Sequence, residues 1–132
     1  MAKANLIGTS CAPFVCNGVI TANHFVKVHT TAGQVIKSNA IADLSCGVAQ
    51  NTTTATGDQI TVQIYGVAKA VLGTGGATVG QELMVIASES GAVGPASGAT
   101  AVTVCVALEA GDSGETIAVL LKTPCGKRPA NT

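Results

Sequence analysis

Residues 57–65 read Gly57-Asp58-Gln59-Ile60-Thr61-Val62-Gln63-Ile64-Tyr65, and this stretch decides the class of the fold. A glycine followed by polar residues is typical of a turn, because glycine accepts a positive φ without steric cost. The residues after the turn alternate between apolar and polar, which is the period of a strand with one buried face. We therefore expect three residues to face a core, namely Ile60, Val62 and Ile64. The residues between and after them should face outward, namely Thr61, Gln63 and Tyr65.

The phrase Gly-x-x-(Ile/Leu)-x-Val occurs three times, at residues 57–62, 80–85 and 114–119. Each copy predicts a turn that leads into a strand, and the third copy is apolar on both faces of its strand. A longer similarity surrounds this phrase, because Gly47-Val48-Ala49 begins ten residues before Gly57 and Cys105-Val106-Ala107 begins nine residues before Gly114. Either the chain contains two related halves, or a sequence rich in Val, Ala and Gly has converged on one strand-turn pattern. The residues leave both readings open.

Further short strands are expected along the rest of the chain. Residues 25–29 and 34–37 predict a hairpin, joined through a turn that ends in glycine. The other expected elements are strands at 67–72, 83–87, 101–108 and 117–121, a loop at 88–98 and one weak helix at 39–46. Because 16 glycines mark turns at regular spacing, the sequence predicts an all-β fold. We expect a single small barrel or sandwich of short antiparallel strands, with extended N- and C-terminal arms.

The two ends of the chain differ from its middle. Residues 1–18 contain Pro13 and no sustained periodicity, whereas residues 122–132 are basic and have little apolar content. Such segments are either frayed termini or arms that become ordered only on the surface of a partner. We therefore expect an N-terminal arm at 1–18, a β domain at 19–121 and a C-terminal tail at 122–132.

The composition favours a protein that binds other proteins. Charged residues make up 11% of the chain and hydrophobic residues 47%, so the apolar surface exceeds what a small domain buries alone. Seven basic and seven acidic residues cancel, which removes the positive field that nucleic-acid binding requires. No apolar run approaches the length of a membrane span, and the first residues lack the apolar core of a signal peptide. We expect no nucleic-acid or membrane partner, and a protein that is made and kept in a cytoplasm.

The five cysteines are an odd number, so they cannot all pair within one chain. Cys105 lies in an apolar run and is expected to be a buried free thiol. The candidate cross-linking thiols lie near the ends of the chain, at Cys11, Cys16 and Cys125. The sequence contains neither a Cys-x-x-Cys pair nor a cluster of His and Cys, so we expect no metal and no cofactor.

One constellation resembles a catalytic site. Gly111-Asp112-Ser113-Gly114 is similar to the tetrapeptide around the nucleophile of chymotrypsin-like serine proteases, and His24 follows a segment similar to the one that holds their histidine. However, only 19 residues follow Ser113, which is too few for the last strands and specificity pocket of that fold. Gly114 is also explained as the start of the third copy of the strand-entry phrase. We expect no enzymatic activity and no catalytic residues.

The order and spacing of these phrases resemble those of small capsid decoration or cement proteins of bacteriophages. The resemblance covers residues 19–121 and rests on 47–49, 57–62, 66–68, 79–83, 105–110 and 114–121. It implies a β-rich, usually oligomeric subunit that binds the outer surface of the major capsid protein lattice and stabilises it. The expected location is therefore the capsid exterior of a virion that is assembled in the cytoplasm of a host bacterium.

These expectations leave three functions open. The first is a decoration or cement protein that forms a homo-oligomer, with a trimer favoured over a dimer. The second is the base of a head fibre or adhesin, against which the shortage of Trp and Tyr argues, because sugar-binding patches use these residues. The third and most remote is a chymotrypsin-like serine protease.

Overall fold

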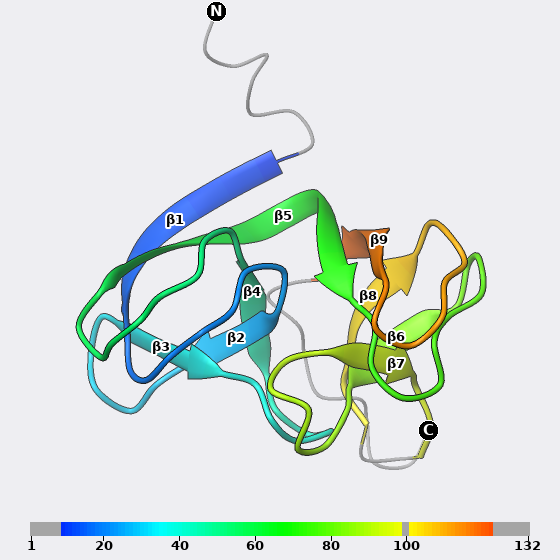
Figure 1. Ribbon diagram of the computed structural model, residues 1–132, viewed down its shortest axis with the longest axis horizontal. Coiled ribbons are helices and arrows are strands. Elements are labelled where there is room, and N and C mark those ends of the chain that lie inside the picture. Colours follow the sequence, from blue (N-terminus) through cyan, green and yellow to red (C-terminus); the bar gives the residue numbers. More distant parts are fainter. Residues whose placement is uncertain (1–8, 99–100, 123–132) are drawn as a thin grey trace, which may run out of the picture.

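The structure is a computed structural model that describes residues 9–98 and 101–122. In these residues the fold consists of nine β-strands. Within those ranges there is no helix, and the all-β class is confirmed (Figure 1). The strands are β1 (Thr9–Cys16), β2 (Phe25–Val28), β3 (Gln34–Lys37), β4 (Ser45–Ala49), β5 (Gln59–Val71), β6 (Glu82–Val85), β7 (Val93–Pro95), β8 (Thr103–Ala107) and β9 (Thr116–Leu121).

The first unit is a closed barrel of five strands. Its neighbours run in the order β1-β3-β2-β4-β5, and β5 pairs back onto β1 to close the ring. All of these pairs are antiparallel except β1–β3, which is a short parallel pair. The predicted hairpin is confirmed as β2 and β3. The small barrel expected from the sequence is therefore present.

The second unit continues from the same long strand, in the order β5-β9-β8-β6-β7. A parallel bridge between Leu72 and Val93 and a 2.8 Å hydrogen bond from Gly73 N to Val93 O join its last strand to the end of β5. In Figure 1 the two units lie side by side, and β5 runs across both. β5 is therefore the last strand of the first unit and the first strand of the second.

The two units have the same topology and the same register. β1 to β5 of the first unit correspond in order to β5 to β9 of the second, including the parallel contact between the first and third strands. Ala49 pairs with Val62 in the first unit, and Ala107 pairs with Val119 in the second. An irregularity after Val26 in β2 recurs at the equivalent place in β6. The repeated phrases of the sequence thus occupy equivalent hairpins.

The hydrogen bonds that close the two rings are equivalent as well. Gly57 N donates to Cys16 O at 2.9 Å, and Gly114 N donates to Leu72 O at 2.7 Å. In the opposite direction, Cys16 N donates to Asp58 O at 3.0 Å and Leu72 N donates to Glu115 O at 2.8 Å. Two related halves, one of the two readings of the sequence, therefore match the structure in detail.

The three glycines that begin the repeated phrase all lie in turns and have positive φ values of +100° at Gly57, +83° at Gly80 and +92° at Gly114. Each is the third residue of a turn that a hydrogen bond closes between the first carbonyl and the fourth N–H, which is a type II turn. The side chain of the fourth residue also accepts a hydrogen bond from the first N–H, through Asp58, Gln81 or Glu115. The repeated phrase therefore encodes one turn, used three times.

β5 departs from the alternation that its sequence predicts. Ile60 and Val62 are buried and Thr61 and Tyr65 are exposed, as expected, but Gln63 is only 5% exposed. Its side-chain amide donates to Val67 O at 2.7 Å and to Tyr65 O at 3.1 Å, across the bend at Gly66, which has a φ of +91°. The prediction that Gln63 faces solvent was wrong, because its amide is buried against the bend and donates to backbone carbonyls on both sides of Gly66.

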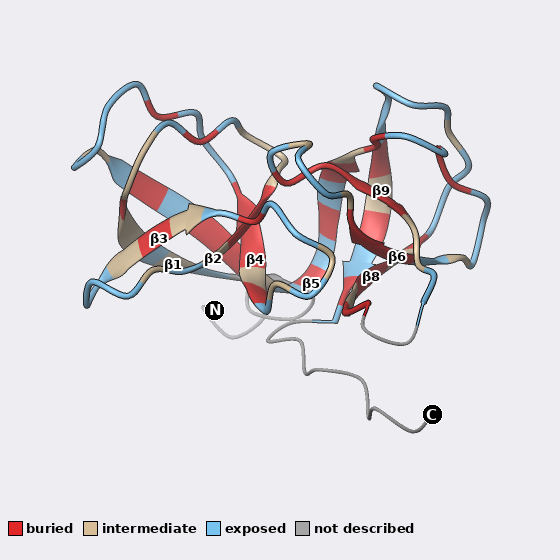
Figure 2. Ribbon diagram, turned by 90° about the horizontal axis from the view of Figure 1, so that it is seen from below, coloured by how far each residue is buried: buried red, intermediate tan, exposed pale blue. Residues whose placement is uncertain are grey.

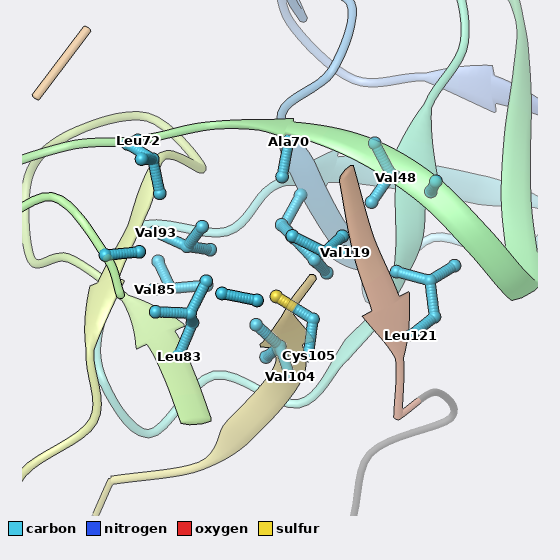
Figure 3. Close-up of a cluster of buried hydrophobic side chains, with 14 of the residues drawn as sticks. Val48, Ala70, Leu72, Leu83, Val85, Val93, Val104, Cys105, Val119 and Leu121 are labelled. Atoms are coloured by element: carbon cyan, nitrogen blue, oxygen red, sulfur yellow. The ribbon is translucent and has the colours of Figure 1, made fainter. Parts of the chain in front are cut away.

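Two apolar clusters fill the interior. The first unit is packed around Cys16, Ile20, Val26, Val35, Ala49, Ile60 and Val62. The larger cluster of the second unit includes the side chains drawn in Figure 3, among them Leu72, Leu83, Val93 and Val119. Phe25 and Val48 of the first unit belong to this second cluster, while their neighbours Val26 and Ala49 belong to the first. β2 and β4 therefore form a wall between the cores, and buried and exposed residues alternate in bands along β5 (Figure 2).

The structure corrects three other expectations. Residues 9–16 of the expected arm are strand β1, because long-range pairing with β5 supplies order that local periodicity does not show. Residues 1–8 of that arm and residues 123–132 of the tail lie outside the described residues. Val93–Pro95 in the expected loop forms β7.

The expected helix at 39–46 is instead a turn followed by β4. The Asp43 carboxylate accepts hydrogen bonds from the N–H groups of Asn39 and Ala40 and contacts Lys27 Nζ at 2.9 Å, which favours the turn over a helix. Burial alone would raise the pKa of Asp43, but these hydrogen bonds and the charge of Lys27 outweigh it and hold the pKa below its ordinary value.

The turn geometry predicts the effect of replacing Gly80. No atom lies near an added Cβ, so Gly80→Ala introduces only the cost of a positive φ, and we expect a loss of about 1 kcal/mol in the free energy of unfolding. Gly80→Asn should lose less, because asparagine tolerates this conformation. Urea denaturation measures both variants. Equal stability of Gly80→Ala and the original protein would contradict the assigned turn.

The wall between the cores predicts a large effect at Phe25, the only fully buried aromatic side chain among the described residues. Phe25→Ala should lower the free energy of unfolding by about 3–5 kcal/mol, because it removes a large side chain that is packed at the junction of the units. Phe14→Ala is the matched control, and it should cost less because Phe14 is only half-buried. Thermal unfolding followed by circular dichroism compares the two variants, and a larger loss at Phe14 would contradict this packing.

Candidate interaction surface

The outer side of the second unit carries an exposed apolar surface. Val67 of β5 pairs with Leu120 of β9, and Leu120 pairs with Val106 of β8, so these three side chains form one row across the sheet. Val67 is 49% exposed and Leu120 is 44% exposed, while Val106 is half-buried. Contiguous apolar residues on an outer sheet face mark interaction sites more often than scattered ones do.

A second row lies beside the first and combines apolar and charged groups. Lys69 of β5 pairs with Ala118 of β9, and Leu108 N donates to Ala118 O at 3.0 Å. Glu109 Oε2 accepts a hydrogen bond of 3.1 Å from Ala118 N, which places the carboxylate beside β9 on the side opposite Lys69. We call the surface formed by both rows the β9 face; its residues are Val67, Lys69, Val106, Leu108, Glu109, Ala118 and Leu120.

The equivalent positions of the first unit carry no charged residue, and two of them, Val48 and Gln63, are buried. Thr61 of β5 lies in the place of Ala118, and it is flanked by Pro13 of β1 and by Asn51, whose side chain accepts a 2.8 Å hydrogen bond from Thr61 N. A shallow hollow lies on this side of the barrel, lined by Pro13, Gln50, Asn51, Gln59, Ile60 and Thr61. A second hollow lies where the two outer surfaces meet, lined by Asn23, Gln50, Gln63, Val67, Ala68, Lys69 and Ala118.

The sequence contained a signal for the β9 face. The third copy of the repeated phrase and the residues after it are apolar on both sides of the strand. The structure buries Ile117, Val119 and Leu121 and leaves Leu120 exposed. The pairing of Leu120 with Val67 and Val106 could not be predicted, because it depends on the sheet order.

The cysteines proposed for cross-linking lie in different environments. Cys11 is exposed on β1 and its thiol is free. Cys16 is fully buried, and its thiol donates to Ala55 O at 3.1 Å, so it cannot reach a thiol of another chain in the folded protein. Cys125 lies outside the described residues. Cys105 is buried as expected, and burial raises the pKa of its thiol far above the ordinary value.

The two residues that resemble a protease site, His24 and Ser113, lie in the segments that lead into β2 and β9. His24 Nδ1 lies 3.0 Å from Ala22 O, in the chain just before β2. Ser113 is the second residue of the exposed turn that leads into β9, where Gly114 N is held by Leu72 O. Over residues 9–98 and 101–122, no three side chains of His, Cys, Asp or Glu are grouped to hold a metal ion. The same residues form no helix that could cross a membrane.

No protein-family model matches the sequence, and no curated protein matches it either. Among solved structures, the head fiber gp8.5 N base in bacteriophage phi29 has a similar fold, with a TM-score of 0.67. The similarity covers 86% of this chain and 94% of that chain, at 14% sequence identity. At this identity it shows a shared fold.

The burial of the cysteines predicts their reactivity. In a Cys125→Ser background, Cys11 should react rapidly with a thiol reagent in the folded protein, whereas Cys16 and Cys105 should react only as the protein unfolds. Mass spectrometry of labelled peptides measures each rate. Cys11→Ser is the matched control and should remove the fast phase, and fast labelling of Cys16 would contradict its burial.

Proposed function

We propose that this protein is a structural component of a bacteriophage head and that its β domain binds the outer surface of the capsid as a decoration or cement subunit. The observation that carries the proposal is the fold, which is shared with a head fibre base over 94% of that chain. The resemblance of residues 19–121 to decoration proteins points in the same direction.

The surface chemistry supports a binding role. Eight large apolar side chains are exposed on the described residues, and 11% of the whole chain is charged. Covering such a surface with another protein lowers the free energy, because apolar side chains are removed from water. On a capsid, weak contacts of this kind are repeated by the symmetry of the lattice, so a subunit that makes several of them at once binds tightly.

A second candidate function is the base of a head fibre, in which the domain attaches a longer structure to the capsid. The structural similarity favours this function directly, because the similar protein is itself a head fibre base. Both candidates require the same first step, which is attachment of the β domain to the head. They differ in whether attachment stabilises the capsid lattice.

Binding to purified capsids tests the proposal. We expect the protein to bind expanded capsids more tightly than free major capsid protein, because only the lattice presents several neighbouring sites together. Cosedimentation measures the two affinities. Ser113→Ala is the control for a catalytic role and should bind equally and leave any proteolytic processing unchanged.

Heating the capsids separates the two candidates. A cement protein raises the temperature at which bound capsids lose their integrity, and a fibre base binds without raising it. Light scattering and electron microscopy of heated capsids measure this temperature. Equal affinity for capsids and free capsid protein would count against both functions.

A further inference from the structure

The two units provide an internal comparison between equivalent positions. In the β-pairing, Leu120 of the second unit corresponds to Gln63 of the first, since these residues pair with Val106 and Val48 in equivalent hairpins. Leu108 corresponds to Gln50, since their N–H groups donate to the equivalent carbonyls of Ala118 and Thr61. The same fold thus carries amides at two positions in one unit and leucines in the other.

This difference is the opposite of what solvent exposure predicts, because apolar leucines lie at exposed positions. Gln63 is 5% exposed, whereas Leu120 at the equivalent position is 44% exposed. Leu108 is 43% exposed, and the exposed position equivalent to it carries Gln50. Gln50 shows that the fold accepts an exposed amide at the position of Leu108, and Leu120 is itself exposed, so neither leucine is required to fill the interior. Apolar side chains at exposed positions where the fold accepts polar ones indicate a surface that another protein covers.

The rim of the β9 face carries opposite charges at its two sides. Lys69 lies on the β5 side and Glu109 on the β8 side, level with Ala118 between them. Glu82 extends the acidic side, because it pairs with Val106 in the neighbouring row. At the equivalent positions the first unit has Pro13 and Asn51, which are uncharged. An apolar centre with charges at its rim is the usual anatomy of a protein interface.

We propose that the β9 face binds the β9 face of a second copy of this chain, around a two-fold axis that runs along β9. This axis exchanges the β5 and β8 sides, so Lys69 of each copy faces Glu109 of the other and Leu120 meets Leu120 at the centre. An in-plane axis perpendicular to β9 would instead bring like charges together. Charge complementarity therefore indicates a second copy as the binding partner and fixes the orientation of the two copies.

The continuous sheet of the second unit suits this arrangement. Two sheets pack face to face with nearly aligned strands, and an axis along β9 keeps the strands of the two copies aligned. The resulting oligomer has an even number of copies, in place of the trimer that the sequence favoured. This dimer forms in the free protein and does not depend on capsid binding.

Substitution by the residues of the first unit tests the proposal. We expect the purified protein to be a dimer in analytical ultracentrifugation, and the double variant Leu108→Gln/Leu120→Gln to raise the dimer dissociation constant by about 100-fold or more. The melting temperature of the monomer should be unchanged, because Leu108 and Leu120 are 43% and 44% exposed and neither belongs to an apolar core. Val28→Gln is the matched control, since Val28 is 61% exposed on β2, and it should leave dimerisation unchanged.

Charge reversal tests the orientation separately. Lys69→Glu should weaken dimerisation by about tenfold, because two attractive contacts become repulsive, and Lys69→Gln, which only removes the attraction, should weaken it less. A monomeric or trimeric protein would overturn the proposal, as would a dimer that the double leucine variant leaves intact. If the original protein is a monomer and the variant Leu108→Gln/Leu120→Gln no longer binds capsids, the β9 face binds the capsid instead of a second copy.

Discussion

The shared strand β5 is the constraint on which the rest of the structure depends. Its first half pairs with β1 and β4, and its second half pairs with β9, so one segment supplies a wall to each ring. The bend at Gly66 turns the strand from one ring to the other, and the Gln63 amide binds the carbonyls of Tyr65 and Val67 across that bend. The positive φ of Gly66 explains why glycine is required at this point.

Small side chains and close backbone packing compensate for the scarcity of aromatic residues. The chain has two phenylalanines and one tyrosine, and both cores consist mainly of Val, Ala, Leu and Ile. At Gly47 a Cβ would meet the Gln63 carbonyl and the Val62 side chain, so the β4–β5 pair packs closer than a side chain would allow. The single buried aromatic, Phe25, lies where the two cores meet.

Local patterns in the sequence predicted the elements that depend on local chemistry. The turn glycines, the alternation of Ile60 and Val62, and the hairpin of β2 and β3 follow from spacing within a few residues. β1 escaped prediction because its order comes from β5, about fifty residues further along the chain. The expected helix failed because the Asp43 carboxylate binds backbone N–H groups, a contact that hydrophobic periodicity does not reveal. The β9 face was visible only as a strand that is apolar on both sides, and its neighbours required the sheet order.

Sharing β5 also has a kinetic consequence. Because removing either ring takes a wall from the other, the two units are expected to lose their structure together in one cooperative transition. The pairs of β5 with β1 and of β5 with β9 join residues that are far apart in sequence, and closing such long loops before any contact forms makes folding slow. During that delay the apolar strands remain uncovered, which exposes the unfinished chain to association with other unfolded copies.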